Sequence, residues 1–132
     1  AKIIRVVDRD DRSEEQIAEL MEDGIKVLSK RNIEGYLLDE TVLEKWCEIE
    51  DQKDKIDEVK EIRRKRLEES IERGNAPDDL KSAGNDICTD LKKLFKLKQC
   101  GNNGEYIMRD TISKMITEDM EVYQSIERDI FG

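Results

Sequence analysis

Two short apolar runs with one helical segment between them constrain the fold of this chain more than any other feature. Residues 3–7 are rich in β-branched side chains and residues 25–28 are mostly apolar, so each run predicts a short strand. The near-continuous apolar character of the first run favours a buried strand. A strand, a helix and a strand in this order predict a parallel pair joined by a right-handed crossover.

The helix between the two runs has clear start and stop signals. The segment Ser13–Gln16 matches a capping box, in which both side chains bond backbone amides at the helix start. Ile17, Leu20 and Met21 form one apolar stripe, and Gly24 is a typical helix stop.

After residue 40 the apolar residues recur with helical spacing alone. The first predicted helix starts at a second capping box, Thr41–Glu44, and the next two cover residues 50–73 and 85–98. After a turn at 101–104, another predicted helix carries Ile107 to Ile116. Thr117 is expected to cap the last helix, which carries Met120 to Ile130. The sequence therefore predicts a helix-rich α/β fold. A parallel β-α-β unit occupies residues 1–48, and a helical C-terminal region, residues 49–132, packs on it.

Composition limits the possible functions. The chain has 132 residues, which suits one domain, and carries 24 basic against 33 acidic residues, a net charge of −9. A protein this acidic does not bind nucleic acid by bulk charge, although metal ions can neutralise an acidic cluster locally.

The cysteines and the hydropathy exclude further classes of site and of protein. Cys47, Cys88 and Cys100 are widely spaced and histidine is absent, which excludes a Cys/His zinc site and a histidine-activated nucleophile. We expect reduced thiols in a cytoplasmic protein. No apolar run approaches the roughly 20 residues that cross a bilayer, so no membrane partner is expected.

Acidic residues follow both predicted strands. Asp8 and Asp10 come directly after the first, and alternate residues of a strand share a face, so both carboxylates can reach one cation. Glu34 follows the second strand and is expected beside them. Oxygen ligands of this kind favour Mg²⁺ or Mn²⁺. The alternative is a solvated acidic turn before a capped helix, with Glu34 at a helix start that favours negative charge.

Basic residues close to these acids are candidate phosphate contacts. Arg31 and Lys30 lie between the second strand and Glu34, where either can hold a phosphate or pair with a carboxylate. The residues predicted to contact a nucleic-acid backbone lie on the long helix and are Arg63, Arg64, Lys65 and Arg66. The alternative is a solvated helix face, on which they pair with Glu58, Glu61, Glu68 and Glu69.

The segments that carry these residues are similar to a known family. Residues 8–13 (DRDDRS) and 28–39 (LSKRNIEGYLLD) resemble the Toprim nuclease portion of OLD-like (overcoming lysogenization defect) proteins, bacterial proteins in which an ABC-type ATPase domain precedes a Toprim domain. Asp8 and Asp10 match the family's DxD, and Glu34 matches an acidic position in its R-x-I-E-N-Y-L-L segment. Gly35 replaces the more usual asparagine, and the similarity covers only residues 3–43.

The resemblance implies a partial Toprim-like fold and, in the intact parent, a metal-dependent DNA endonuclease. Asp8, Asp10 and Glu34 would hold Mg²⁺ or Mn²⁺, while Glu34, Arg31 and Lys30 would serve phosphodiester hydrolysis. The family's first strand with its glutamate is missing, and the chain has no GxxxxGK[ST] motif. We therefore expect the C-terminal piece of an ATPase–nuclease, separated from its N-terminal ATPase domain and inactive alone. A sheet edge exposed in this way can pair with a second copy in a homodimer.

Two hypotheses of other classes stay open. A non-enzymatic helical protein-interaction module with a vestigial acidic site accounts for the missing glutamate and the acidic, helical remainder. A phosphoacceptor domain that resembles response-regulator receivers also carries paired acids at a strand end, but its phosphoacceptor aspartate follows a later strand that is not evident here.

Overall fold

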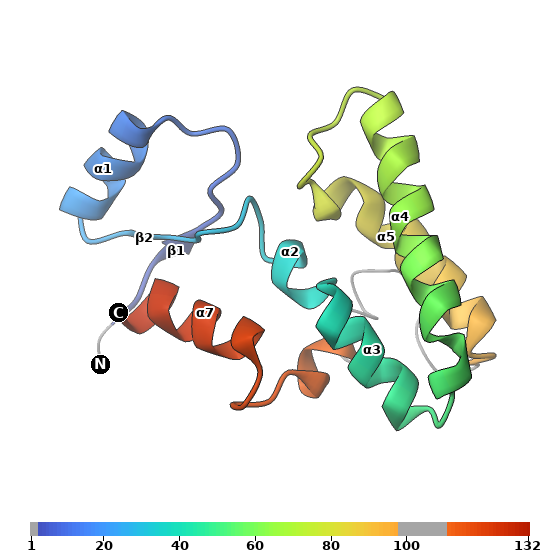
Figure 1. Cartoon of the computed structure of the whole chain (residues 1–132). Helices are drawn as coiled ribbons and strands as arrows, with labels where there is room; N and C mark the ends of the chain where they lie inside the picture. Colours follow the sequence, from blue (N-terminus) through green and yellow to red (C-terminus); the bar gives the residue numbers. More distant parts are fainter. Residues whose placement is uncertain (1–2, 98–110) are drawn as a thin grey trace.

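The computed structural model describes residues 3–97 and 111–132 (Figure 1). The elements are β1 (Val6–Val7), α1 (Glu14–Glu22), β2 (Lys26–Val27), α2 (Glu34–Leu37), α3 (Glu40–Ile49), the 3₁₀ turn η1 (Lys53–Lys55), α4 (Ile56–Glu72), α5 (Leu80–Leu94), the 3₁₀ turn η2 (Ile112–Met115) and α7 (Glu121–Phe131). This helix-rich α/β architecture is the predicted one. The predicted turn at 101–104, Cys100 and the beginning of the helix expected from Ile107 lie outside the described residues.

The two strands pair in parallel, which confirms the predicted β-α-β unit. Val6 lies opposite Lys26. The amide of Lys26 donates to the carbonyl of Arg5 at 2.8 Å, and the amide of Leu28 donates to the carbonyl of Val7 at 3.1 Å. Parallel pairing brings the carboxyl ends of both strands, and the loops that follow them, to the same edge.

The prediction that the first strand is buried is wrong. The exposed fractions of Ile3, Ile4 and Val6 are 89%, 44% and 38%. The reason is that β1 pairs with β2 alone, so its other edge has no partner among the described residues. Because Arg5 and Val7 turn their carbonyls to β2, the alternate residues Ile4 and Val6 turn their backbone groups to the open edge.

Helix α1 has the predicted capping box. The Ser13 hydroxyl accepts from the amide of Gln16 at 3.2 Å, and the Gln16 side chain accepts from the amide of Ser13 at 2.9 Å. Gly24, with φ +78°, follows the helix in the left-handed region that glycine favours. Ile17 is buried, but Met21 at the end of the stripe is exposed.

Two later helices begin elsewhere than predicted. Asp39, rather than Thr41, caps α3, because its carboxylate accepts the amide of Thr41 at 3.0 Å. The helix expected from residue 50 begins at Ile56, since Asp51 has φ +55° and interrupts the helical backbone.

The starts of the last two helices also differ. Helix α5 begins at Leu80 instead of residue 85, because Asp79 caps it; apolar spacing gave no signal there. Helix α7 begins at Glu121 and not behind Thr117, and its N-terminus has no side-chain cap. The short η2 occupies part of the segment expected to be α-helical.

One hydrophobic core joins the helices to the end of β2. Trp46 of α3 and Phe95 after α5 pack with ring centroids 5.0 Å apart. The same cluster of buried residues extends from Leu28, next to β2, to Val122 in α7, and it includes the fully buried Tyr36. Because residues on both sides of position 48 share this core, the division of the chain into residues 1–48 and 49–132 stays a prediction. No helix in the described ranges is long and apolar enough to cross a bilayer.

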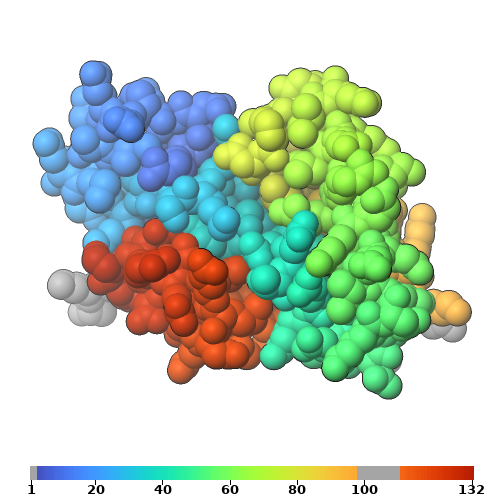
Figure 2. All heavy atoms as spheres, viewed as in Figure 1, coloured from blue at the N-terminus to red at the C-terminus, as the bar shows by residue number. Residues whose placement is uncertain are grey.

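The C-terminal helix returns to the N-terminal unit. In Figure 1 α7 lies beside the β1–β2 pair, and in the space-filling view of Figure 2 its red surface abuts the blue and cyan residues. The ammonium of Lys26 donates to the carbonyl of Gly132 at 3.2 Å. The loop that follows β2 therefore contacts α7, through Asp129, and the segment at the start of α5, through Asp78 and Asp79.

Candidate functional site

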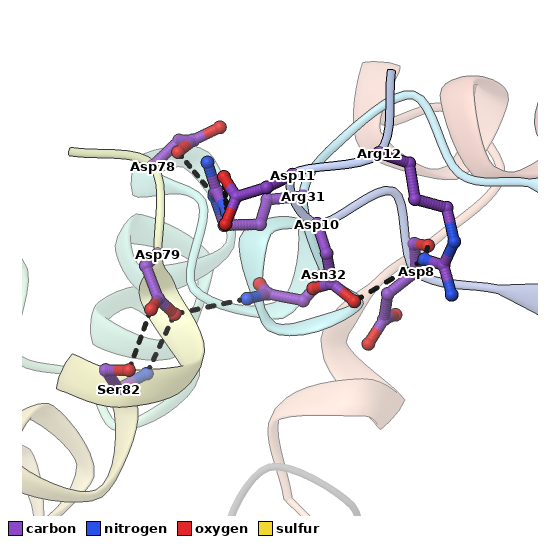
Figure 3. Close-up of polar contacts among 9 residues, drawn as sticks. All are labelled: Asp8, Asp10, Asp11, Arg12, Arg31, Asn32, Asp78, Asp79 and Ser82. Carbon is purple, nitrogen blue, oxygen red and sulfur yellow. Dashed lines mark hydrogen bonds and ion pairs between the residues drawn. The ribbon is translucent and has the colours of Figure 1, made fainter. Parts of the chain in front are cut away.

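The acidic loop that follows β1 is tied to the loop that follows β2. The amide of Asp10 donates to the carbonyl of Arg31 at 2.9 Å, and the close-up in Figure 3 shows the side chains that converge around this bond. The structure thus places the two predicted segments at one sheet edge, as the parallel pairing requires.

The argument from strand alternation does not hold for Asp8 and Asp10. The strand ends at Val7, and Asp10 has φ +47°, so the backbone has left the extended conformation between the two aspartates. Arg12 holds this loop instead. Its guanidinium donates to the backbone carbonyl of Asp8 and lies 3.5 Å from the Asp10 carboxylate (Figure 3).

Glu34 occupies the first position of α2, in the short helix predicted for it. Its carboxylate oxygen Oε2 is buried and has no hydrogen-bond partner among the described residues. Asp10, by contrast, is exposed and faces Arg12. One carboxylate turns into the protein and the other turns toward solvent.

Two observations bear on whether a cation fits here. The unpartnered Glu34 oxygen is an acceptor that a cation could satisfy, since buried oxygens normally have a partner. Across residues 3–97 and 111–132, however, no three acidic or cysteine side chains come close enough to hold a metal ion. The expected convergence of Asp8, Asp10 and Glu34 on one cation is therefore absent from the described residues.

Arg31 pairs with carboxylates, one of the two roles predicted for it. It lies 2.7 Å from a carboxylate oxygen of Asp11 and 2.7 Å from one of Asp78, which precedes α5 (Figure 3). The hydrogen bonds to Asp78 and Asp11 raise the pKa of Arg31 above its ordinary value. With two carboxylates bound, its charge is neutralised within the chain, and a phosphate would have to displace one of them.

A second polar contact beside Arg31 was not predicted. Asn32 is 2% exposed and donates from Nδ2 to Asp79 Oδ1 at 3.3 Å, while Asp79 also accepts from the amide of Ser82 at 3.1 Å. Burial acts to raise the pKa of Asp79, but hydrogen bonds from Ser82 and Asn32 outweigh it, and the pKa lies below its usual range. The sequence signal was an aspartate three residues before a serine at a helix start.

Asp129 makes another unpredicted contact, between α7 and the loop after β2. Its Oδ2 accepts from the amide of Ser29 at 3.1 Å, from the Ser29 hydroxyl at 2.8 Å and from the Tyr36 hydroxyl. Burial acts to raise the pKa of Asp129, but these hydrogen bonds outweigh it and hold the pKa below its ordinary value. The only signal was an acid at helical spacing from Val122 and Ile126, on the apolar face of α7.

The basic cluster on α4 is largely neutralised by its own chain. Arg63 donates to the carbonyl of Leu38 at 2.8 Å and lies 3.9 Å from Glu40, and Arg64 pairs with glutamates one turn away on the same helix. Arg66 forms a two-bond contact to Asp90 of α5, at 2.6 and 3.1 Å. These contacts match the alternative of a paired helix face. Nucleic-acid binding by residues 63–66, including exposed Lys65, stays a prediction.

Cys47 and Cys88 are free thiols in the core, as expected of reduced cysteines. Burial raises the pKa of Cys88 to about 12, so this thiol is protonated and unreactive near neutral pH.

Comparison of the chain with protein-family models, with curated proteins and with solved structures finds no match.

Proposed function

We propose that this chain is a piece of an OLD-like Toprim nuclease, whose intact parent cleaves DNA in a metal-dependent reaction in the cytoplasm. The proposal extends the resemblance carried by Asp8, Asp10 and Glu34. The observation that supports it most directly is the bond between the amide of Asp10 and the carbonyl of Arg31, which joins the two acidic loops at the carboxyl edge of a parallel pair.

The described residues do not supply a complete ligand set for Mg²⁺ or Mn²⁺, so the proposal requires a contribution from outside them. The open edge of β1, where Ile4 and Val6 expose their backbone groups, is the position at which a further strand would pair. A glutamate at the end of such a strand, as in the family pattern, would reach the same sheet edge as Asp8. We propose that this strand completes the site and that the isolated chain is inactive.

The second candidate, a non-enzymatic interaction module, rests on a different observation. Arg31 is bound by Asp11 and Asp78, and the arginines of α4 are bound by acceptors of their own chain. Because these arginines already pair with acceptors of their own chain, their presence does not require a metal site or bound DNA. This hypothesis predicts that Asp8→Ala and Asp10→Ala change neither metal affinity nor any activity of the parent.

The experiment that separates the two is a plasmid-nicking assay with Mg²⁺ or Mn²⁺ on a longer protein that includes the sequence preceding Ala1 in its gene. We expect nicking that falls at least about 100-fold in Asp8→Ala and Asp10→Ala, since each removes a metal ligand. Asp23→Ala, in the exposed turn after α1, is the matched control and should retain full activity. Equal nicking by all four proteins, or none by any, contradicts the nuclease proposal.

A further inference from the structure

A pocket of about 390 Å³ lies between the loop after β2 and the C-terminal helix. Its lining comes from three segments and includes Lys30, Asp39, Thr41, Glu121, Ser125 and Arg128. None of them belongs to the proposed metal site at Asp8, Asp10 and Glu34. The pocket is therefore a separate place at which the molecule can bind a ligand.

Lys30 is held in a defined position at this pocket. A Cβ atom on Gly35 would lie 3.3 Å from Cδ of Lys30, so the absence of a side chain at position 35 lets the lysine stem lie across α2. The ammonium then sits 5.7 Å from the centroid of the buried Tyr36 ring. A lysine fixed in this way loses less conformational freedom on binding an anion than a fully exposed one.

Arg128 faces the same pocket from α7, and the helix is held there by its neighbour Asp129. The three hydrogen bonds from Ser29 and Tyr36 to Asp129 fix this part of α7 against the segment that carries Lys30. The backbone amide of Lys30 also donates to the Tyr36 hydroxyl at 3.2 Å, so one network ties the segment that carries Lys30 to the helix that carries Arg128.

The charged groups of the lining leave Lys30 and Arg128 free to pair with a bound anion. Within the described residues neither Lys30 nor Arg128 forms an ion pair, in contrast to Arg31 and Arg66. Of the two lining acids, Asp39 has its Oδ1 engaged by the amide and hydroxyl of Thr41. The first turn of α7 adds backbone amides that no side chain caps, and these favour negative charge. The carboxylates of Glu121 and Asp39 oppose an anion, and Glu121 is the one whose oxygens no hydrogen bond from Thr41 engages.

We propose that this pocket binds a phosphate group between Lys30 and Arg128. Two cations, a hydroxyl at Ser125 and the uncapped first turn of α7 line one pocket and are donors that a tetrahedral anion can use. The group can belong to free phosphate, to a nucleotide or to a nucleic-acid backbone, which share this chemistry. The proposal does not depend on the metal site, and it assigns the phosphate role suggested by the sequence to Lys30 rather than to the neutralised Arg31.

The test is a titration of the ¹⁵N-labelled chain with inorganic phosphate in EDTA at low ionic strength, followed by the backbone signals of residues 30, 121, 122 and 128. We expect saturable shifts, with binding about tenfold weaker in Lys30→Ala and in Arg128→Ala because each loses a charged hydrogen bond. The matched controls, Lys81→Ala and Arg73→Ala, change exposed cations away from the pocket and should bind as the natural chain does. Glu121→Gln removes the opposing carboxylate and should tighten binding a few-fold.

Competition identifies the source of the phosphate group. A short single-stranded oligonucleotide that displaces phosphate assigns the pocket to a nucleic-acid backbone, and displacement by AMP alone assigns it to a nucleotide. Shifts that do not saturate, or binding that is equal in Lys30→Ala, Arg128→Ala and the two controls, overturn the proposal. Because EDTA removes divalent metal, neither result depends on whether the acidic loops bind Mg²⁺.

Discussion

The β1–β2 unit and the α3–α5 helices of this molecule are stabilised in different ways. Helices α3, α4 and α5 enclose fully buried side chains such as Trp46, Ile87 and Leu91. The N-terminal unit exposes Ile4 and Val6. Besides Leu28, which joins the shared core, polar bonds connect it to the remainder: Arg31 to Asp78, Asn32 to Asp79, and Ser29 to Asp129 in α7. The comparison shows that the helical part is stabilised chiefly by apolar burial, whereas the predicted site depends on a few polar contacts made far along the chain.

The largest difference between the regions should come from truncating apolar side chains. Leu91→Ala removes a fully buried side chain from the helical core and should lower the free energy of unfolding by about 3 kcal/mol. Ile4→Ala, on the exposed strand, should change it by less than about 0.5 kcal/mol. Chemical denaturation measures both. Similar losses for the two variants would mean that β1 is covered in solution, by a second copy or another partner.

The next largest effect is expected at Asp129. Asp129→Ala leaves the buried Tyr36 hydroxyl and the Ser29 donors without their acceptor, and should cost about 2 kcal/mol. Hydrogen exchange should rise in α7 and β2 and stay unchanged in α4. Glu127→Ala, an exposed acid on the same helix, is the control. Unchanged exchange in α7 would show that apolar contacts alone hold this helix.

Acid should weaken the same polar contacts. The pKa values of Asp79 and Asp129 lie below the usual value of about 4 for an unfolded aspartate. The folded chain therefore binds fewer protons at these groups, and the stability they contribute is complete above pH 4 and lost as the pH falls through their folded pKa values. Unfolding free energies measured between neutral pH and pH 3 should fall, and the fall should be smaller in Asp129→Asn. If the unfolding free energy falls equally with pH in the natural chain and in Asp129→Asn, then Asp129 does not contribute to the acid sensitivity.

The smallest changes in the free energy of unfolding are expected for the arginine variants, and these changes should differ between the two regions. Arg31→Ala breaks two contacts to exposed carboxylates, so it should cost about 1 kcal/mol or less. Arg64→Ala, on the exposed face of α4, should leave the denaturation midpoint unchanged. Raising the salt concentration should shrink the Arg31 effect. A larger loss for Arg64 than for Arg31 would contradict the contrast between the two regions.

The same contrast explains which parts of the structure the sequence could predict. Parallel pairing and the Ser13–Gln16 capping box follow from local pattern, and both are confirmed. Helix starts were missed where one aspartate caps the backbone, as Asp39 and Asp79 do, because capping outweighs apolar spacing.

The predicted site was recovered only in part, for a physical reason. Adjacency of the strand ends follows from topology, so the loops of Asp10 and Arg31 do meet. The directions of the side chains do not follow from topology. Left-handed backbone at Asp10 and the inward turn of Glu34 depend on tertiary contacts, as do the partners Asp78 and Asp129, which lie 47 and 100 residues beyond Arg31 and Ser29.

The most direct test of the proposed metal site is an Mn²⁺ titration of the longer protein, which includes the strand proposed to complete the site, followed by NMR line broadening. The account predicts that backbone signals of residues 8–11 and 31–34 broaden together at low Mn²⁺, and that Asp8→Ala with Asp10→Ala abolishes this while Asp23→Ala does not. Even broadening over the acidic surface, unchanged in the double variant, would contradict it.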